Sequence, residues 1–166
     1  MASESTPVYR FGDLLALARQ SWLREMADAL RSMGYPDYRR SDAQSLRLLQ
    51  REPVTIGRLG EALGVTRQAA RKVATGLERR GFAVSARDIR DARQVNLTLT
   101  PEGDRYAEAI VTVIERMNRS LSERVRPADL AAADTVLRSV LIGGRARTLA
   151  EQLGRPGGDR GPRAAP

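Results

Sequence analysis

The stretch TIGRLGEALGVTRQAARKVATGLERRGF, residues 55–82, decides the fold of this chain of 166 residues. Apolar side chains in residues 56–63 follow helical spacing after Thr55, which suits the N-cap position, and a glycine ends that helix. A second helix is predicted from a Thr66 cap to about Arg80. Two short helices joined by a glycine-containing turn are typical of a helix-turn-helix, although an ordinary helical hairpin shows the same pattern.

The two faces of the second helix differ in chemistry. At 100° per residue, one side gathers the apolar residues Ala70, Val73, Ala74 and Leu77. The opposite side gathers Gln68, Arg71, Lys72, Thr75 and Arg79, with no acid among them. Arginine and lysine can read guanine, glutamine can read adenine, and threonine can touch a thymine methyl group. The alternative is a solvated basic face. The candidate DNA-binding residues of this helix are Thr66, Arg67, Gln68, Arg71, Lys72 and Thr75.

A short hairpin is predicted directly after these helices. Residues 82–86 and 95–99 alternate as strands, and the loop between them is basic. A hairpin with a basic tip in this place is typical of a wing, whose arginines are long enough to enter a narrow minor groove. The candidate wing contacts are Arg87, Arg90, Asp91 and Arg93. Thr100 then caps the next helix, with Pro101 at its first position.

Composition narrows the function classes further. The net charge is +8, and residues 51–100 hold ten cationic against five acidic side chains, which favours a polyanionic partner for this segment. All but one of the 28 cations are arginine. GC-rich codons account for this enrichment in arginine as well as a functional role does. Cysteine and histidine are absent, so thiol chemistry, histidine-based metal sites and histidine general bases are excluded. The sequence predicts no enzyme, no cofactor and no metal.

Helices are also predicted on both sides of the helix-turn-helix and its hairpin. One helix is predicted from Phe11 to Met33, and a second runs to about Gln50 with Ser41 or Asp42 as its cap. Two further helices, 101–124 and one from about Pro127, carry long apolar stripes: Tyr106, Ile110, Val113, Met117 and Leu121 on the first, and Leu130, Leu137, Val140, Leu141 and Ile142 on the second. These stripes exceed what a small winged lobe buries, so a twofold dimer is expected, with packing inside one protomer as the alternative.

Several motifs in order carry a family resemblance. They are IGRLGEALGVT (56–66), LERRGF (77–82), DAR (91–93) followed by LTPEG (99–103), and GYPD (34–37). DAR followed by LTPEG is similar to the D-x-R…L-T-x-x-G wing signature of the MarR family of winged helix-turn-helix transcriptional regulators. Each motif is weak alone, but their order and spacing together are specific.

The resemblance covers about residues 10–145 and implies a homodimer with a helical dimerisation domain and two winged lobes. By that analogy Asp91 orients the wing arginine and Arg93 reaches DNA, whereas an exposed ion pair within the hairpin is the alternative. It also implies a pocket for a small amphipathic or phenolic effector between the domains. The candidate lining is Trp22, Met26, Met33, Tyr35 and Tyr38, with Arg39 or Arg40 able to meet an anion; plain core is the alternative.

The predicted fold is mainly α with a small β-wing, about six helices and a two- to three-stranded sheet. Residues 41–100 are expected to form the winged helix-turn-helix lobe, 8–40 and 101–147 the helical dimerisation region, and 1–7 and 148–166 flexible ends. The predicted function is a homodimeric repressor that binds an inverted-repeat operator in double-stranded DNA and is relieved by a small ligand. The alternative is a winged-helix protein-interaction module. With no membrane span or signal peptide in the sequence, the cytoplasm is the expected compartment.

Overall fold

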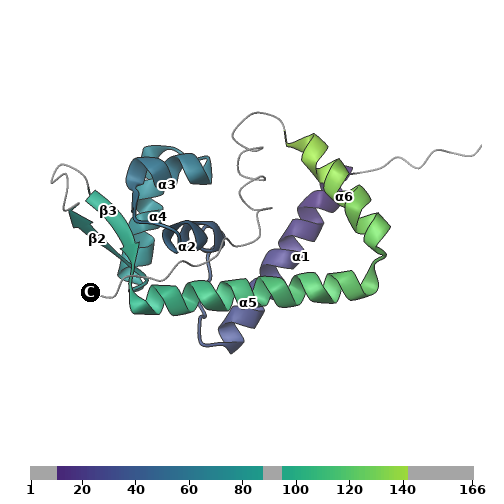
Figure 1. Cartoon of the computed structure of the whole chain (residues 1–166), viewed down its shortest axis with the longest axis horizontal. Helices are drawn as coiled ribbons and strands as arrows, with labels where there is room; N and C mark the ends of the chain where they lie inside the picture. The colour runs from purple at the N-terminus through teal and green to yellow at the C-terminus, as the bar shows by residue number, and fades with distance from the viewer. Residues whose placement is uncertain (1–10, 88–94, 142–166) are drawn as a thin grey trace, which may run out of the picture.

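The computed structural model describes residues 11–87 and 95–141, and these ranges contain six helices and three strands (Figure 1). Their order along the chain is α1 (Phe11–Ser32), α2 (Asp42–Leu49), β1 (Val54–Thr55), α3 (Ile56–Leu63), α4 (Arg67–Arg79), β2 (Ala83–Arg87), β3 (Val95–Leu99), α5 (Pro101–Arg124) and α6 (Pro127–Val140). The predicted fold class is therefore confirmed.

Threonine side chains begin three of the helices, as the sequence predicts. The hydroxyl oxygens of Thr55, Thr66 and Thr100 accept hydrogen bonds from the backbone N–H groups three residues further on. Ser41 is different: it occupies the N-cap position of α2, but its backbone is helical and its side chain makes no capping bond. The predicted Ser41 cap is therefore wrong, and Asp42 has another role, described below.

The three strands form one antiparallel sheet in the order β1-β3-β2. Leu97 in the central strand pairs with Val54 on one side and Ser85 on the other, and it is buried. The predicted first hairpin strand begins one residue late, at Ala83, because Phe82 belongs to the turn. The N–H of Phe82 donates to the carbonyl oxygen of Leu77 at 3.0 Å, at the end of α4, and the carbonyl oxygen of Phe82 accepts from the N–H of Thr100 at 3.1 Å.

The core lies where the first half of α5 passes beside α2 and the winged lobe (Figure 1). Each helix from α1 to α5 contributes to one continuous cluster, whose fully covered members include Leu30, Leu46, Leu59, Leu77 and Ile110. The stripe predicted on α5 is confirmed for Tyr106, Ile110, Val113 and Met117, whereas Leu121 is half-buried. The core therefore joins the winged lobe to α1 and α5.

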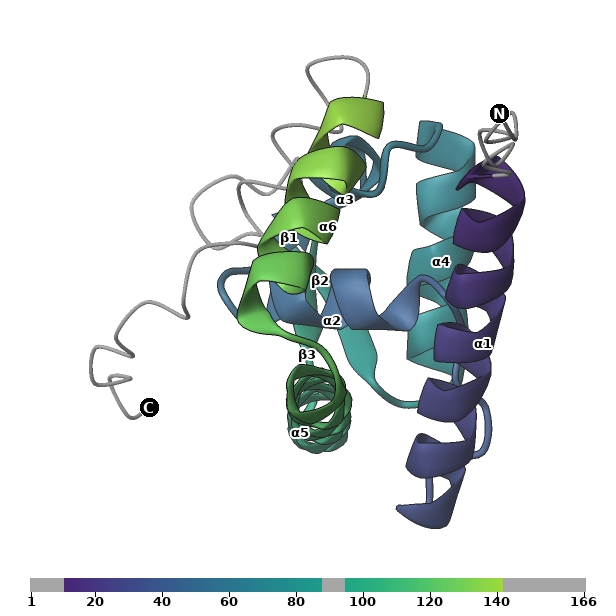
Figure 2. The same ribbon diagram turned by 90° about the vertical axis from the view of Figure 1, so that its right-hand side faces the viewer.

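The last helix differs from all the others because none of the α6 side chains is buried. Leu137 is 43% exposed, and Val136 and Val140 are exposed to a similar extent. The beginning of α1 is also apolar and exposed, at Leu14 and Leu17. Figure 2, which looks along α5, shows α6 rising above that helix and α1 standing apart from α6 on the right. The chain therefore leaves apolar surface uncovered on two helices, α6 and the start of α1.

Across residues 11–87 and 95–141, no helix is both long enough and apolar enough to cross a membrane.

A glycine in the first turn of α5 allows the sheet and this helix to meet. A Cβ at Gly103 would lie 1.8 Å from the carbonyl oxygen of Phe82, so Gly103→Ala must displace backbone. We expect this change to lower the free energy of unfolding by about 2 kcal/mol or more, measured by urea denaturation. Gly57→Ala is the matched control, since a Cβ there meets only the Thr55 hydroxyl at 3.8 Å. Equal stability of the two variants would contradict the close approach.

Candidate nucleic-acid interface

The outward face of α4 is exposed because its opposite side is buried. Ala70, Ala74 and Leu77 are covered, and Gly60 of α3 lets the two helices approach, since a Cβ there would lie 3.4 Å from that of Ala70. The six candidate residues of this helix are all exposed: Thr66, Arg67, Gln68, Arg71, Lys72 and Thr75. We call the outward residues Gln68, Arg71, Lys72, Thr75 and Arg79 the recognition face.

The charges of the recognition face are uncompensated within the described part of the chain. Its arginine and lysine side chains form no ion pair with any acid in residues 11–87 or 95–141, although ion pairs occur elsewhere on the surface, such as Arg105–Glu102. Three cations, an amide and a hydroxyl therefore point into solvent from one helix. This arrangement can donate hydrogen bonds to an anionic or base-edge partner.

The wing is described only in part. Arg87, the last residue of β2, is exposed, while Arg90, Asp91 and Arg93 lie outside the described residues. The roles predicted for Asp91 and Arg93 therefore stay predictions.

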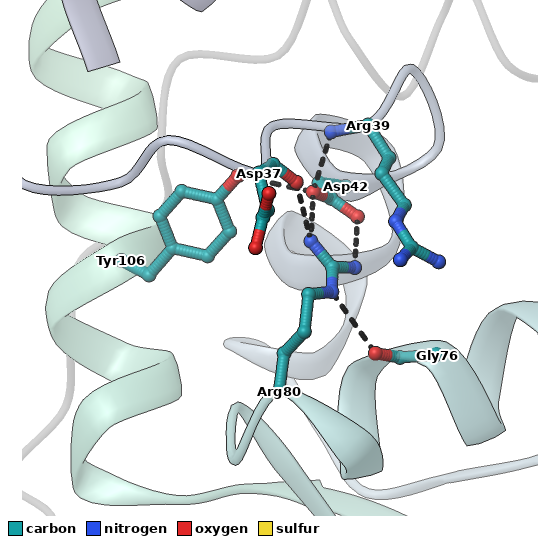
Figure 3. A network of polar contacts seen from close by, with 6 residues as sticks. All are labelled: Asp37, Arg39, Asp42, Gly76, Arg80 and Tyr106. Carbon is teal, nitrogen blue, oxygen red and sulfur yellow. Dashed lines mark hydrogen bonds and ion pairs between the residues drawn. The ribbon is translucent and has the colours of Figure 1, made fainter. Parts of the chain in front are cut away.

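A buried ion pair joins the C-terminal end of α4 to the start of α2 (Figure 3). Nη1 and Nη2 of Arg80 donate to the two carboxylate oxygens of Asp42 at 2.7 and 2.8 Å. The Asp42 side chain is 0% exposed and that of Arg80 is 11% exposed. Such a bidentate geometry is among the strongest that a carboxylate and a guanidinium can form.

The same two side chains also contact α5, the segment between α1 and α2, and the preceding turn of α4. Asp42 also accepts from the hydroxyl of Tyr106 on α5 at 3.0 Å and from the backbone N–H of Arg39 at 2.8 Å. Arg80 donates to the carbonyl oxygens of Gly76 and Asp37, both at 2.9 Å. The hydrogen bond to Asp42 raises the pKa of Arg80, and burial followed by the Asp42 charge raises the pKa of Tyr106. A charged Arg80 and a protonated Tyr106 are therefore the stable forms.

The pairing of Asp42 with Arg80 was not predicted from the sequence, although the sequence holds one signal for it. Asp42, Leu46 and Leu49 occur at positions i, i+4 and i+7, so the carboxylate lies on the inward stripe of α2. An acid on a buried stripe needs a cationic partner, and Arg80 is the residue that closes α4.

A surface cleft of about 390 Å³ opens beside the network. Aromatic rings form part of its wall: Tyr35 stacks on Tyr106 at 4.6 Å between ring centroids, and Phe82 lies 4.4 Å from Tyr106. Polar groups come from the segment between α1 and α2, from α4 and from α5. The lining residues are Gly34, Tyr35, Pro36, Asp37, Arg79, Arg80, Phe82, Glu102 and Tyr106.

The five residues predicted to line an effector pocket are not gathered at this cleft. Tyr35 lines it, whereas Met26 is buried in the core and Met33 is 44% exposed. Trp22 is half-buried against the core, and the Tyr38 hydroxyl donates to the Met26 sulfur at 3.7 Å. Burial, followed by the charge of Asp42, raises the pKa of Tyr38 to about 12. The predicted pocket and the observed cleft therefore meet only at Tyr35.

The order of helices and strands and the exposed face of α4 define a winged helix-turn-helix fold. The model of the MarR family matches residues 37–94, so the resemblance to that family predicted from the sequence is confirmed over the winged lobe. No curated protein shows a significant sequence match.

Solved structures of MarR-family regulators share the fold over most of the chain. MepR of Staphylococcus aureus bound to DNA is 19% identical with a TM-score of 0.69, covering 80% of this chain and 97% of its own. PcaV of Streptomyces coelicolor, solved with its natural ligand, is 24% identical with a TM-score of 0.62, covering 84% and 96%. MarR of E. coli is 19% identical with a TM-score of 0.60, covering 81% and 98%.

Removing one partner of the buried pair should be costly. Asp42→Ala leaves the Arg80 guanidinium buried without its counter-ion, and we expect a loss of about 3–5 kcal/mol in the free energy of unfolding. Asp28→Ala is the matched control, because it breaks an exposed arginine–carboxylate pair with Arg31, and it should cost no more than about 1 kcal/mol. Urea denaturation measures both values. Similar losses in the two variants would show that burial does not determine how much the Asp42–Arg80 pair contributes to the free energy of unfolding.

Proposed function

We propose that this protein is a homodimeric regulator of transcription that binds a specific sequence in double-stranded DNA, and that it represses by occupying its operator. The observation that carries the proposal is the recognition face of α4. It is exposed, it holds three cations without an acid, and it lies on the second helix of a helix-turn-helix. A helix of this kind fits the major groove, where its side chains reach base edges. The DNA complex of MepR, which shares the fold, supports this assignment.

A dimer accounts for the uncovered surface of α6. An isolated helix of 14 residues is marginal in water, and α6 buries none of its side chains within the protomer. The exposed start of α1 adds further apolar area. Burying these surfaces against a second copy of the chain would stabilise both, and a twofold pair is the commonest arrangement of identical subunits. We assign residues 8–40 and 101–147 to this dimerisation region and residues 41–100 to the DNA-binding lobe.

A small amphipathic or phenolic effector completes the proposal. The cleft beside Tyr35 has a volume in the range of ligand sites, with aromatic walls and the cationic Arg79 at its edge. PcaV, which shares the fold, was solved with its natural ligand. A ligand that prefers one spacing of the two lobes would weaken operator binding by no more than its difference in affinity for the two states.

Base reading and dimer geometry can be tested on duplexes selected from a random DNA pool. We expect an inverted repeat with half-site centres about 10–10.5 bp apart, or a multiple of that spacing. On the best site, Arg71→Ala and Gln68→Ala should each cost about 1–3 kcal/mol of binding free energy and relax the preference at one base pair. Competition titrations against single-base variants of the site measure both effects.

Two controls separate reading from assembly. Arg119→Ala removes one exposed cation from the α6 end of α5 and should leave the specificity profile unchanged. Leu137→Glu should dissociate the dimer in sedimentation experiments, whereas Val84→Glu, at a similarly exposed position on β2, should not. Unchanged specificity in both α4 variants would place the reading face elsewhere, and a single asymmetric half-site at saturating protein would refute the dimer.

The effector can be tested with a panel of phenolic carboxylates. Trp22 is the only tryptophan and packs against the core, so its fluorescence reports on the packing of α1 against the rest of the core. We expect at least one compound to change this fluorescence and to lower operator affinity at the same concentration. Tyr35→Ala should abolish both responses, because Tyr35 belongs to the predicted pocket and to the cleft. Responses that are identical in Tyr35→Ala would exclude this location.

A further inference from the structure

The segment between α1 and α2 places one arginine against α4. A Cβ built on Gly76 would lie 3.1 Å from Nη1 of Arg39, so the guanidinium rests on the helix at a position without a side chain. Figure 3 shows the Arg39 side chain extending toward the turn of α4 that contains Gly76. An arginine that is distant in sequence therefore adds its charge to the recognition helix.

The buried ion pair holds both sides of this contact. The backbone N–H of Arg39 donates to Asp42, and its carbonyl accepts from the Asp42 N–H, each at 2.8 Å. On the other side, Arg80 donates to the Gly76 carbonyl at 2.9 Å. The backbone of Arg39 and the surface on which its side chain lies are thus fixed by the same two buried residues.

The charge of Arg39 is available to a partner outside the protomer. Its side chain is exposed and forms no ion pair with an acid in the described parts of the chain. Gly76 follows Lys72 by one turn, which rotates its position by about 40° around the helix axis. Arg39 therefore lies at the flank of the recognition face, next to Lys72, where the phosphates that border a groove run past a bound helix.

We propose that Arg39 is a phosphate contact that extends the DNA interface from α4 onto the segment between α1 and α2. The inference rests on the proposed DNA-binding function. Arg39 fixes the position of the protein on the duplex and does not read bases, while Asp42, Arg80 and the missing side chain at Gly76 position its guanidinium. Neutralising a phosphate releases counter-ions, which gives the contact a signature in salt dependence.

The first test is a salt titration of binding to the selected operator and to an unrelated duplex. In Arg39→Ala, the slope of log affinity against log salt should fall by about 0.9 per protomer, and affinity for both duplexes should fall by a similar factor, about three- to tenfold. Arg39→Lys keeps the charge and should restore most of the slope. Arg119→Ala loses the same charge far from α4 and should keep the wild-type slope.

The second test uses Gly76. A methyl group there would lie 3.1 Å from Nη1 of Arg39, so the guanidinium must shift by a few tenths of an ångström away from α4. Gly76→Ala should therefore weaken binding about threefold, while its thermal unfolding midpoint stays at or above that of the wild type, since alanine favours a helix interior. In the Arg39→Ala background the same change should have no effect on affinity. An equal effect in both backgrounds would show that Gly76 acts independently of Arg39.

The outcomes separate this inference from the function on which it rests. Wild-type protein that binds no duplex in the random pool overturns the proposed function. Wild-type protein that binds its operator, with the same salt slope in Arg39→Ala, overturns the Arg39 contact alone. A lower slope that Arg39→Lys also shows would overturn the electrostatic role, because the charge is retained in that variant.

Discussion

The Asp42–Arg80 ion pair is the constraint on which the arrangement of the winged lobe depends. It joins α2 to the end of α4, and its further hydrogen bonds reach α5 through Tyr106 and the preceding linker through Asp37 and Arg39. Apolar packing would allow α4 to rotate or slide by small amounts, because hydrophobic contact is not directional. Two parallel hydrogen bonds to one buried carboxylate fix both the direction and the depth of the helix end.

The cleft shares two side chains with the ion pair and its hydrogen-bond partners: Arg80 and Tyr106. Any molecule that occupies the cleft therefore touches groups that also set the position of α4. The aromatic stack of Tyr35, Tyr106 and Phe82 forms the apolar side of this region, and the guanidinium of Arg80 lies 5.3 Å from the centre of the Phe82 ring. A change at the cleft wall is thus coupled, through Arg80 and Tyr106, to the orientation of the recognition face.

Sequence reasoning predicted the elements better than the contacts between them. Capping threonines, helical spacing and strand alternation are local signals, so the helix-turn-helix, the hairpin strands and the start of α5 at Pro101 followed from them. Asp42 and Arg80 are 38 residues apart, and nothing local pairs them. The alternation of residues 82–86 also suggested a strand that begins at Phe82. The backbone of Phe82 instead bonds to Leu77 at the end of α4 and to Thr100 before α5. The exposure of α4 was predictable from its two faces. The cleft was not, because its lining comes from three separate stretches of the chain.

Lys72 is the only lysine in the chain. It is exposed on α4, one turn before Gly76. Primary-amine chemistry on side chains is therefore confined to this one position, whereas the other 27 cations are guanidinium groups, which acylating reagents leave unchanged at neutral pH. Acylation of the folded protein removes one positive charge from the recognition face and leaves the charge of every other side chain in place.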